Sequence, residues 1–141
     1  LKRTSHGSTL SRIVHAQLAE MAQFHELSWQ LYQEALYSDY RDIQGGTTAE
    51  GIHTGVMAAT IHVTLATYAG VDTRQNELSI CPNLPEHWQA LAFQFIHQGV
   101  TYQFSLTQTS VTITADKDTQ LLVQGALIPL TAERPKEVHY Q

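Results

Sequence analysis

The feature that most constrains the fold is the stretch from Gly51 to Val71, which contains no Asp, Glu, Lys or Arg. It is long enough to cross a bilayer as a helix, which takes about 20 predominantly apolar residues. However, two histidines and four threonines interrupt it, and such polar side chains are unfavourable in lipid. A helix that is apolar on all sides is otherwise buried inside a large soluble protein. We therefore expect a buried helix here and no membrane partner.

Helical periodicity also marks the residues before this stretch. Apolar side chains recur at helical spacing in two segments: Leu10, Ile13, Val14, Leu18, Met21 and Phe24, and then Leu27, Leu31 and Ala35. A third helix is predicted from Thr48 to about Ala69, ended by Gly70, since glycine commonly follows the last helical residue. Three helices, one of them apolar all round, cannot close a core alone. We therefore expect the chain, which opens on Leu1 without a leader, to come from inside a longer protein.

The period changes from helical to alternating after Gly70. Apolar residues then alternate with polar ones in segments typical of strands that bury one face: Leu91, Phe93 and Phe95; Tyr102, Phe104 and Leu106; Val111 and Ile113; and the run QLLVQGALIPL. A turn is predicted at Gln98-Gly99, between the first two segments. The pattern predicts an α+β chain with a helical part, residues 1–71, and an antiparallel β-sandwich, residues 72–141.

Composition excludes several classes of function. The net charge is -5 and the pI is near 5.8, so no basic stripe is present to neutralise the phosphates of a nucleic acid. The single cysteine, Cys81, excludes an internal disulfide and fits a reducing, cytoplasmic compartment. The histidines are scattered and show no zinc-ligand spacing. We therefore expect no nucleic-acid partner, no metal and no cofactor.

Two predicted helix starts carry candidate binding residues. TSHGSTLS places Gly7 directly before Ser8, a predicted N-cap, and QGGTTAE places Gly45-Gly46 directly before Thr47. Helix N-termini carry free amide groups and a partial positive charge, so they bind anions. An anion site would result if both starts faced one cavity. Two ordinary capped helices are the simpler explanation of the same residues.

Glu50 fits two motifs. With Thr47 it forms a capping box, in which each side chain bonds the backbone amide of the other residue. With His53 it forms E-x-x-H, the spacing found in di-metal carboxylate bundles. Those bundles need a second such pair, which the sequence lacks. We therefore assign Glu50 to capping and not to a metal site.

Three blocks of the sequence resemble the C-terminal portion of glycoside hydrolase family 65. They are RTSHGSTLS, DIQGGTTAEGIHTGVMAAT and LSICPNLPEHWQALAFQFIHQG, in matching order and spacing. The family includes the maltose, trehalose and kojibiose phosphorylases and related α-glucosidases. The resemblance implies that residues 1 to about 70 are the last helices of an (α/α)6 barrel catalytic domain. A small, jelly-roll-like C-terminal β-sandwich would follow them.

The resemblance also implies roles for individual residues. Those that match the family's phosphate-side loops are Ser5, His6, Gly7, Ser8, Gly45, Gly46, Thr47 and His53. His53 corresponds to a histidine that lies where related hydrolases place a basic carboxylate, so it is expected to donate to a phosphate oxygen. Glu50 would be a supporting cap. The general acid, a glutamate, lies far upstream in the family, so this chain alone is expected to contain no catalytic residue and to be inactive.

The function implied by the resemblance is part of an inverting α-glucoside phosphorylase. Inorganic phosphate, as co-substrate, would attack an α-linked glucose disaccharide and give β-glucose 1-phosphate. Because phosphate is itself the nucleophile, it dispenses with the base that an inverting glycosidase uses to activate water. The alternatives are a hydrolase of the same family, or a β-domain that binds carbohydrate or forms dimers without catalysis. A homodimer is common among the family's phosphorylases, and the disaccharide linkage does not follow from these residues.

Overall fold

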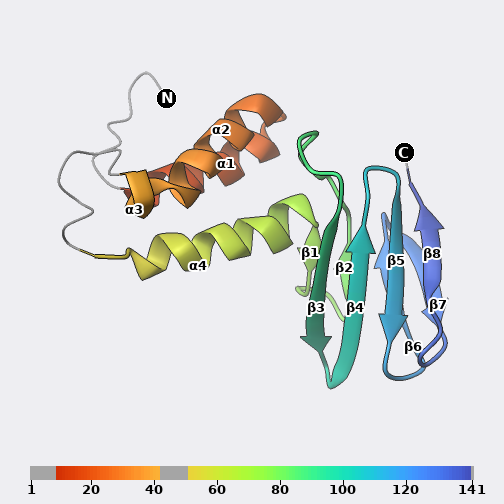
Figure 1. Ribbon diagram of the computed structural model, residues 1–141. Helices are drawn as coiled ribbons and strands as arrows, with labels where there is room; N and C mark the ends of the chain where they lie inside the picture. The colour runs from red at the N-terminus through yellow and green to blue at the C-terminus, as the bar shows by residue number, and fades with distance from the viewer. Residues whose placement is uncertain (1–8, 42–50, 141) are drawn as a thin grey trace. The chain divides into compact units, whose positions relative to one another are not determined.

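The computed structural model describes residues 9–41 and 51–140 (Figure 1). The chain divides into two compact units, Leu1–Thr64 and Leu65–Gln141. In the described residues the first unit is helical, and the second begins with a short helical segment and continues as two β-sheets. The expected α+β class is therefore confirmed. The division between residues 71 and 72 stays a prediction.

The helical unit is built on a hairpin of two helices, α1 (Thr9–Met21) and α2 (His25–Leu36). Gln23, with φ of 62°, reverses the chain between them, and the Phe24 amide donates to the Ala19 carbonyl at 2.9 Å. The buried apolar residues of the unit include several alanines, which let helices approach closely: Ile13, Ala16, Ala19, Leu31, Tyr32, Ala35, Val56 and Val63. The core therefore draws on α1, α2 and the last helix of the unit.

Helix α1 is apolar on a second face as well. Leu10, Val14, Leu18 and Met21 follow one another at helical spacing, and each is between 49% and 75% exposed. We call these four residues the outer face of α1. A helix with apolar residues on more than one side needs packing partners on more than one side. The expectation of further helices beyond this chain now rests on this face.

The last helix of the unit, α4 (Thr54–Val63), begins later than the sequence predicts. Gly51 has a φ of +99°, and His53 precedes the helix with φ of -79° and ψ of 86°. A helix running without interruption from Thr48 is therefore wrong, because residues 51–53 are not helical. Before α4, the single-turn helix α3 (Ser38–Arg41) follows α2, and its buried Ser38 hydroxyl donates to the Ala35 carbonyl at 2.8 Å.

Helix α4 changes its winding at its C-terminal end. The hydroxyl of Thr60 donates to the Met57 carbonyl at 2.7 Å, and that of Thr64 donates to the Thr60 carbonyl at 2.8 Å. Such bonds compete with the helix's own ladder and bend it. The chain continues from Thr64 as a π-helix, η2 (Thr64–Tyr68), where the sequence predicts an uninterrupted α-helix. The hydroxyls of Thr60 and Thr64 are thus satisfied within the protein.

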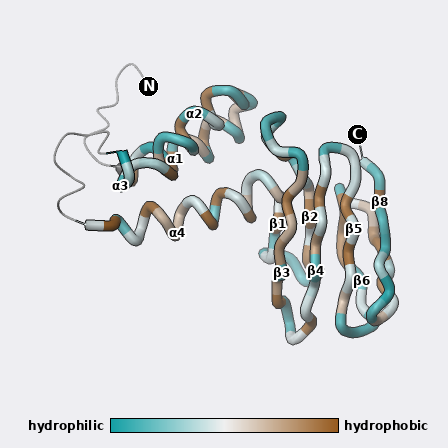
Figure 2. Tube along the Cα trace, in the orientation of Figure 1, coloured by the Kyte–Doolittle hydropathy of each residue, from teal (hydrophilic) through white to brown (hydrophobic). Residues whose placement is uncertain are grey.

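The uncharged stretch is also partly exposed in the described residues. Val56, Thr60 and Val63 are buried, whereas Ile61 is 64% exposed. Figure 2 shows α4 mainly in white and brown, the colours of intermediate and hydrophobic residues. Within the described ranges, none of the helices has the length and hydropathy that a membrane crossing requires.

The β unit consists of two four-stranded sheets that form two layers (Figure 1). The first has the order β1-β2-β6-β7, with strands Val71–Asp72, Ser79–Ile80, Thr119–Val123 and Ala126–Leu130. The second has the order β3-β4-β5-β8, with strands Leu91–His97, Val100–Leu106, Ser110–Ala115 and Lys136–His139. Neighbouring strands are antiparallel except β2 and β6, which are parallel.

Strand register puts the predicted apolar residues on one face. Phe93 pairs with Phe104, and Phe104 pairs in turn with Ile113. The Phe93 and Phe104 rings are stacked with centroids 5.0 Å apart. On the opposite face, Gln94 pairs with Gln103, as the alternating pattern requires. The expected one-sided burial of these strands is confirmed.

Two hairpins of the β unit use the same dipeptide. Gln98-Gly99 joins β3 to β4 with φ of 50° and 74°, and Gln124-Gly125 joins β6 to β7 with φ of 47° and 81°. Positive φ at both central residues characterises the type I′ turn, whose twist matches that of paired strands. The turn predicted at Gln98-Gly99 is confirmed, and QLLVQGALIPL forms two strands.

Gly70 does more than follow a helix. It has φ of +68°, and a Cβ atom at this position would lie 2.0 Å from the backbone oxygen of Cys81. The Cys81 amide donates to the Gly70 carbonyl at 3.0 Å. Two backbone segments therefore touch where η2 gives way to β1, and only glycine fits between them.

Candidate functional site

Most of the predicted site residues lie outside the described residues. These are Ser5, His6, Gly7, Ser8, Gly45, Gly46, Thr47 and Glu50. The convergence of the two glycine-preceded loops therefore stays a prediction, as does the capping box. His53 is the predicted phosphate-side residue whose surroundings the structure describes.

His53 is held at the start of α4 by a single carboxylate, that of Asp39 in α3. The His53 backbone amide donates to Asp39 Oδ2 at 2.7 Å. The His53 ring nitrogen Nδ1 lies 2.6 Å from Asp39 Oδ1. The His53 carbonyl in turn accepts from the Val56 amide at 2.9 Å and so begins the hydrogen-bond ladder of α4. Backbone and ring of His53 are thus both tied to the same side chain.

Asp39 is the charged partner of the Asp39–His53 pair. The hydrogen bond from the His53 side chain lowers the pKa of Asp39 below its usual value, against the opposing effect of burial. Asp39 is therefore ionised at neutral pH, and an ionised carboxylate only accepts hydrogen bonds. Nδ1 of His53 is the donor, and Nε2 is the ring nitrogen that Asp39 leaves for another partner. The Asp39 side chain is 10% exposed and that of His53 is 30% exposed.

Contacts of the first and last residues of helix α3, which flank Asp39 in the sequence, anchor the helix. Its buried Ser38 bonds back to α2, and the Arg41 guanidinium stacks over the Tyr37 ring at 4.5 Å from its centroid. Asp39 is separated from His53 by 14 positions and joins no motif. Sequence reasoning missed it, because nothing in YSDYRDIQGG distinguishes Asp39 from Asp42. One signal could have found Asp39. His53 precedes α4 and does not cap the helix with its own side chain, so its backbone amide needs an acceptor from another residue.

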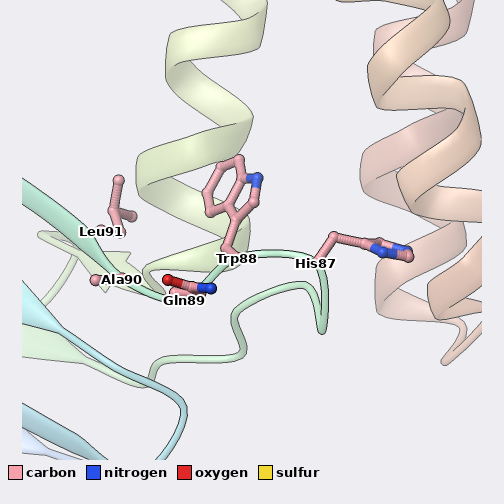
Figure 3. Close-up of a pocket in the computed structure, with 5 residues that line it drawn as sticks. All are labelled: His87, Trp88, Gln89, Ala90 and Leu91. Atoms are coloured by element: carbon pink, nitrogen blue, oxygen red, sulfur yellow. The ribbon is translucent and has the colours of Figure 1, made fainter.

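The β unit contains hollows with less chemistry. One, of about 520 Å³, is lined by the continuous segment from His87 to Leu91, the first residue of β3 (Figure 3). The His87 and Trp88 side chains point away from each other in this view, and Trp88 meets Tyr68 edge-on with centroids 5.6 Å apart. The Gln108 amide pins the loop by donating to the Trp88 carbonyl at 2.7 Å. The segment that lines this hollow is held in place by hydrogen bonds. Its residues do not form a cluster of catalytic or anion-binding groups.

A smaller cavity, of about 210 Å³, lies beside the β3–β4 turn. Its lining includes His97, Tyr102 and Thr119, and the two hydroxyls are 3.1 Å apart. The Nε2 atom of His97 is buried and has no hydrogen-bond partner within the described residues. Water ordinarily satisfies such an atom where a cavity has room for it. Compared with these two hollows, the Asp39–His53 pair is therefore the site better suited to chemistry.

A helical unit followed by a β unit of two sheets makes this an α+β protein. Its family follows from comparison with known sequences. Residues 1–62 match the Glycosyl hydrolase family 65 central catalytic domain. Residues 71–128 match the Glycosyl hydrolase family 65, C-terminal domain. The chain belongs to glycosyl hydrolase family 65, as its three sequence blocks predict.

Two relatives and one solved structure place the chain within longer proteins. Trehalose 6-phosphate phosphorylase of Lactococcus lactis subsp. lactis (strain IL1403) is 40% identical over 84% of this chain and 15% of its own length. Kojibiose phosphorylase of Escherichia coli (strain K12) is 30% identical over 93% of this chain and 17% of its own length. The structure titled "Putative kojibiose phosphorylase from human microbiome" aligns with a TM-score of 0.84 at 21% identity, over 99% of this chain and 20% of its own.

The chain corresponds to a small part of each relative. The chain spans 15% and 17% of the length of the two relatives named above, so most of each of those enzymes has no counterpart in it. The activities are those of the relatives. The likeness in structure, at 21% identity, supports the fold alone.

Proposed function

We propose that this chain is the phosphate-side part of an inverting α-glucoside phosphorylase. The reaction takes an α-linked glucose disaccharide and inorganic phosphate to β-glucose 1-phosphate and a free sugar. A phosphate oxygen bonds to the anomeric carbon as the bond to the departing sugar oxygen breaks, and that oxygen takes a proton from a general acid elsewhere in the intact protein. The observation that carries the proposal is His53, the last residue of the GGTTAEGIH block, which Asp39 holds through two hydrogen bonds.

The geometry of His53 suits an anion site. The residue lies at the start of α4, where helix amides without intrahelical partners and the helix dipole favour negative charge. The first turn of α4 itself contains no acidic residue, and the negative charge beside it is the Asp39 carboxylate that accepts from the His53 amide. Within the described residues, Asp39 bonds the His53 backbone amide and Nδ1, so Nε2 can be offered to a ligand. The relatives named above are both phosphorylases, which supports the same class for the intact protein.

A hydrolase is the second candidate, and one feature of the same pair favours it. A histidine whose Nδ1–H donates to a carboxylate has a lone pair on Nε2 when it is neutral. Such a nitrogen can take a proton from water, as the histidine of a Ser-His-Asp triad takes one from serine. The Asp39–His53 pair could then act as the general base of an inverting hydrolysis. Phosphate and water would compete for the same nitrogen.

The test uses the intact longer protein. It would be incubated with maltose, trehalose, kojibiose, nigerose and trehalose 6-phosphate, each with and without inorganic phosphate, and the products resolved by anomeric NMR. We expect β-glucose 1-phosphate with one of these sugars, formed only when phosphate is present. Free glucose at the same rate with and without phosphate would instead establish a hydrolase. The productive sugar also identifies the linkage.

A further inference from the structure

We infer that strand β3 is an interface through which the intact protein pairs with a second copy of itself, edge to edge and antiparallel. The inference does not depend on the proposed function, because it concerns the backbone edge of a sheet in the β unit. It assigns a partner to a surface that has no role in the phosphorylase reaction.

Strand β3 lies at one edge of its sheet and pairs with β4 alone (Figure 1). On β4, Thr101 faces β5, since its carbonyl accepts from the Asp116 amide at 3.1 Å and its amide donates to Asp116 Oδ1 at 2.9 Å. Backbone direction alternates along a strand, so Tyr102 faces β3 and its partner Phe95 faces β4. The backbone groups of β3 that point away from β4 are therefore those of Ala92, Gln94 and Ile96.

These three residues leave the edge of β3 open. All three are exposed, Ile96 to 66%. Within residues 9–41 and 51–140, no backbone hydrogen bond from another segment reaches their amides or carbonyls. Strand β3 has seven residues, pairs with β4 residue for residue without a bulge, and contains neither proline nor Asp, Glu, Lys or Arg. A long, regular edge of this kind is a template for another strand.

Each of the other three edge strands carries a feature that hinders such pairing. Strand β1 has only two residues, β7 contains the exposed Pro129, and β8 carries Lys136 and Glu137. Short length, proline and charge are ordinary means by which proteins protect a sheet edge. Among the described edges, β3 is therefore the one fitted to accept a strand.

The sequence of β3 is complementary to itself. LAFQFIH is nearly symmetric about Gln94, so a two-fold axis at this residue places Gln94 opposite its own copy. On the outer face, Ala92 then lies opposite Ile96, a small side chain against a large one. On the inner face, the half-buried Phe93 lies opposite Phe95, and paired aromatic residues stabilise neighbouring strands. The backbone groups at the open edge exchange hydrogen bonds across the axis, which joins the two sheets into one.

The distribution of charge favours the same partner. The chain has a net charge of -5, so two copies repel each other at long range. Strands β3, β4 and β5 contain no Asp, Glu, Lys or Arg. The charged residues of the strands in this sheet, Lys136 and Glu137, lie on β8 at the opposite edge. A second copy therefore meets β3 without a contact between like charges in the paired strands.

The test is the association of the intact protein, followed by sedimentation velocity across the micromolar concentration range. We expect a dimer. Gln94→Lys and Gln94→Glu each place like charges against each other at the axis, and each should raise the dimer dissociation constant about tenfold or more. An equimolar mixture of the two variants pairs opposite charges and should restore the dimer. Gln103→Lys adds the same charge to β4, opposite Gln94 within one copy, and as the matched control should leave the dimer intact.

The outcomes decide the inference one way or the other. A protein that stays monomeric across this range would overturn it, as would a dimer that both Gln94 variants leave unchanged or that the mixture fails to restore. Slow hydrogen exchange of the Gln94 amide in a monomer would mean that another segment of the longer protein covers β3, which also overturns it. None of these results depends on phosphate, so the inference and the proposed function fail separately.

Discussion

The two units of this chain differ in how each accounts for its apolar residues. The β unit buries Leu106, Val111, Ile113 and Leu121 completely, and its hairpins are closed by local turns. The helical unit also has a core, but it exposes the outer face of α1. The comparison teaches that one unit contains its packing partners and the other presents surface for partners beyond these residues.

The largest expected effect is on the fold of the β unit. Gly70→Val places a side chain at φ of +68° and against the backbone oxygen of Cys81. We expect a loss of unfolding free energy of about 4 kcal/mol or more, which is exceptional for one substitution and here has a backbone clash as its cause. Denaturant unfolding measures it. Gly125→Ala, at φ of +81° in open space, is the control and should cost about 1–2 kcal/mol.

The next largest expected effect is on the enzymatic activity, through His53 of the helical unit. His53→Ala in the intact protein should reduce kcat or raise the phosphate KM by roughly 30- to 1000-fold, equivalent to about 2–4 kcal/mol, because a preorganised charge-assisted contact is lost. Steady-state kinetics at varied phosphate concentrations measure it, with circular dichroism to check the fold. Phosphate kinetics that stay the same would exclude His53 from the phosphate site.

A substitution on the outer face of α1 tests whether the helical unit has packing partners beyond this chain. Leu18 is 53% exposed in this chain, so Leu18→Ala would change stability by no more than about 0.5 kcal/mol if the face met only solvent. If further helices cover it in the longer protein, the cost should be about 2 kcal/mol or more. Thermal and denaturant unfolding of that protein distinguish the two values. Ile113→Ala, fully buried in the β unit, provides the scale of a covered residue.

The smallest effects concern pH and two carboxylates. The pKa of Asp39 is lowered in the folded protein, so its contribution to stability is fully present above the unfolded value of about 3.9 and is lost as pH falls toward the folded value. Asp39→Asn should flatten the stability profile in that acidic range. Urea midpoints between neutral and acidic pH measure this.

Asp72 in β1 provides the contrast. Its bonds to Arg74 lower its pKa to about 2, but the Arg74 side chain is 87% exposed. Solvent screens such a pair, so Asp72→Asn should leave the acid profile nearly unchanged. A larger effect from Asp72→Asn than from Asp39→Asn would contradict the expectation that the less exposed pair contributes more to stability.

The success of sequence reasoning depended on how local the determinant is. The strands around Phe93 and Tyr102 follow from a period of two, and the turn at Gln98-Gly99 follows from its own dipeptide. The paired strands β1 and β2 each have only two residues, too few for a periodic pattern. The start of α4 was misplaced because Gly51 adopts positive φ, a choice that neighbouring residues do not reveal.

The candidate site shows the same division. His53 was predicted because it belongs to a contiguous block of sequence. Asp39 was missed because its role is a contact made in the folded chain between α3 and the start of α4. The winding change at Thr64 belongs to the same class, since it depends on hydroxyl bonds to Thr60 and to Tyr32, whose hydroxyl lies 2.9 Å from that of Thr64. Contacts between distant residues have no local pattern.

The parallel pairing of β2 with β6 has a consequence for how the chain acquires its structure. The Leu122 amide donates to the Leu78 carbonyl and the Gln124 amide to the Ile80 carbonyl, both at 2.9 Å. Closing so large a loop costs more entropy than forming the β3–β4 or β6–β7 hairpins, so such contacts are made slowly. During synthesis from the N-terminus, residues 78–80 must wait until residues 122–124 have left the ribosome. The strands that directly follow the helical residues are therefore among the last of the β unit to be locked in place.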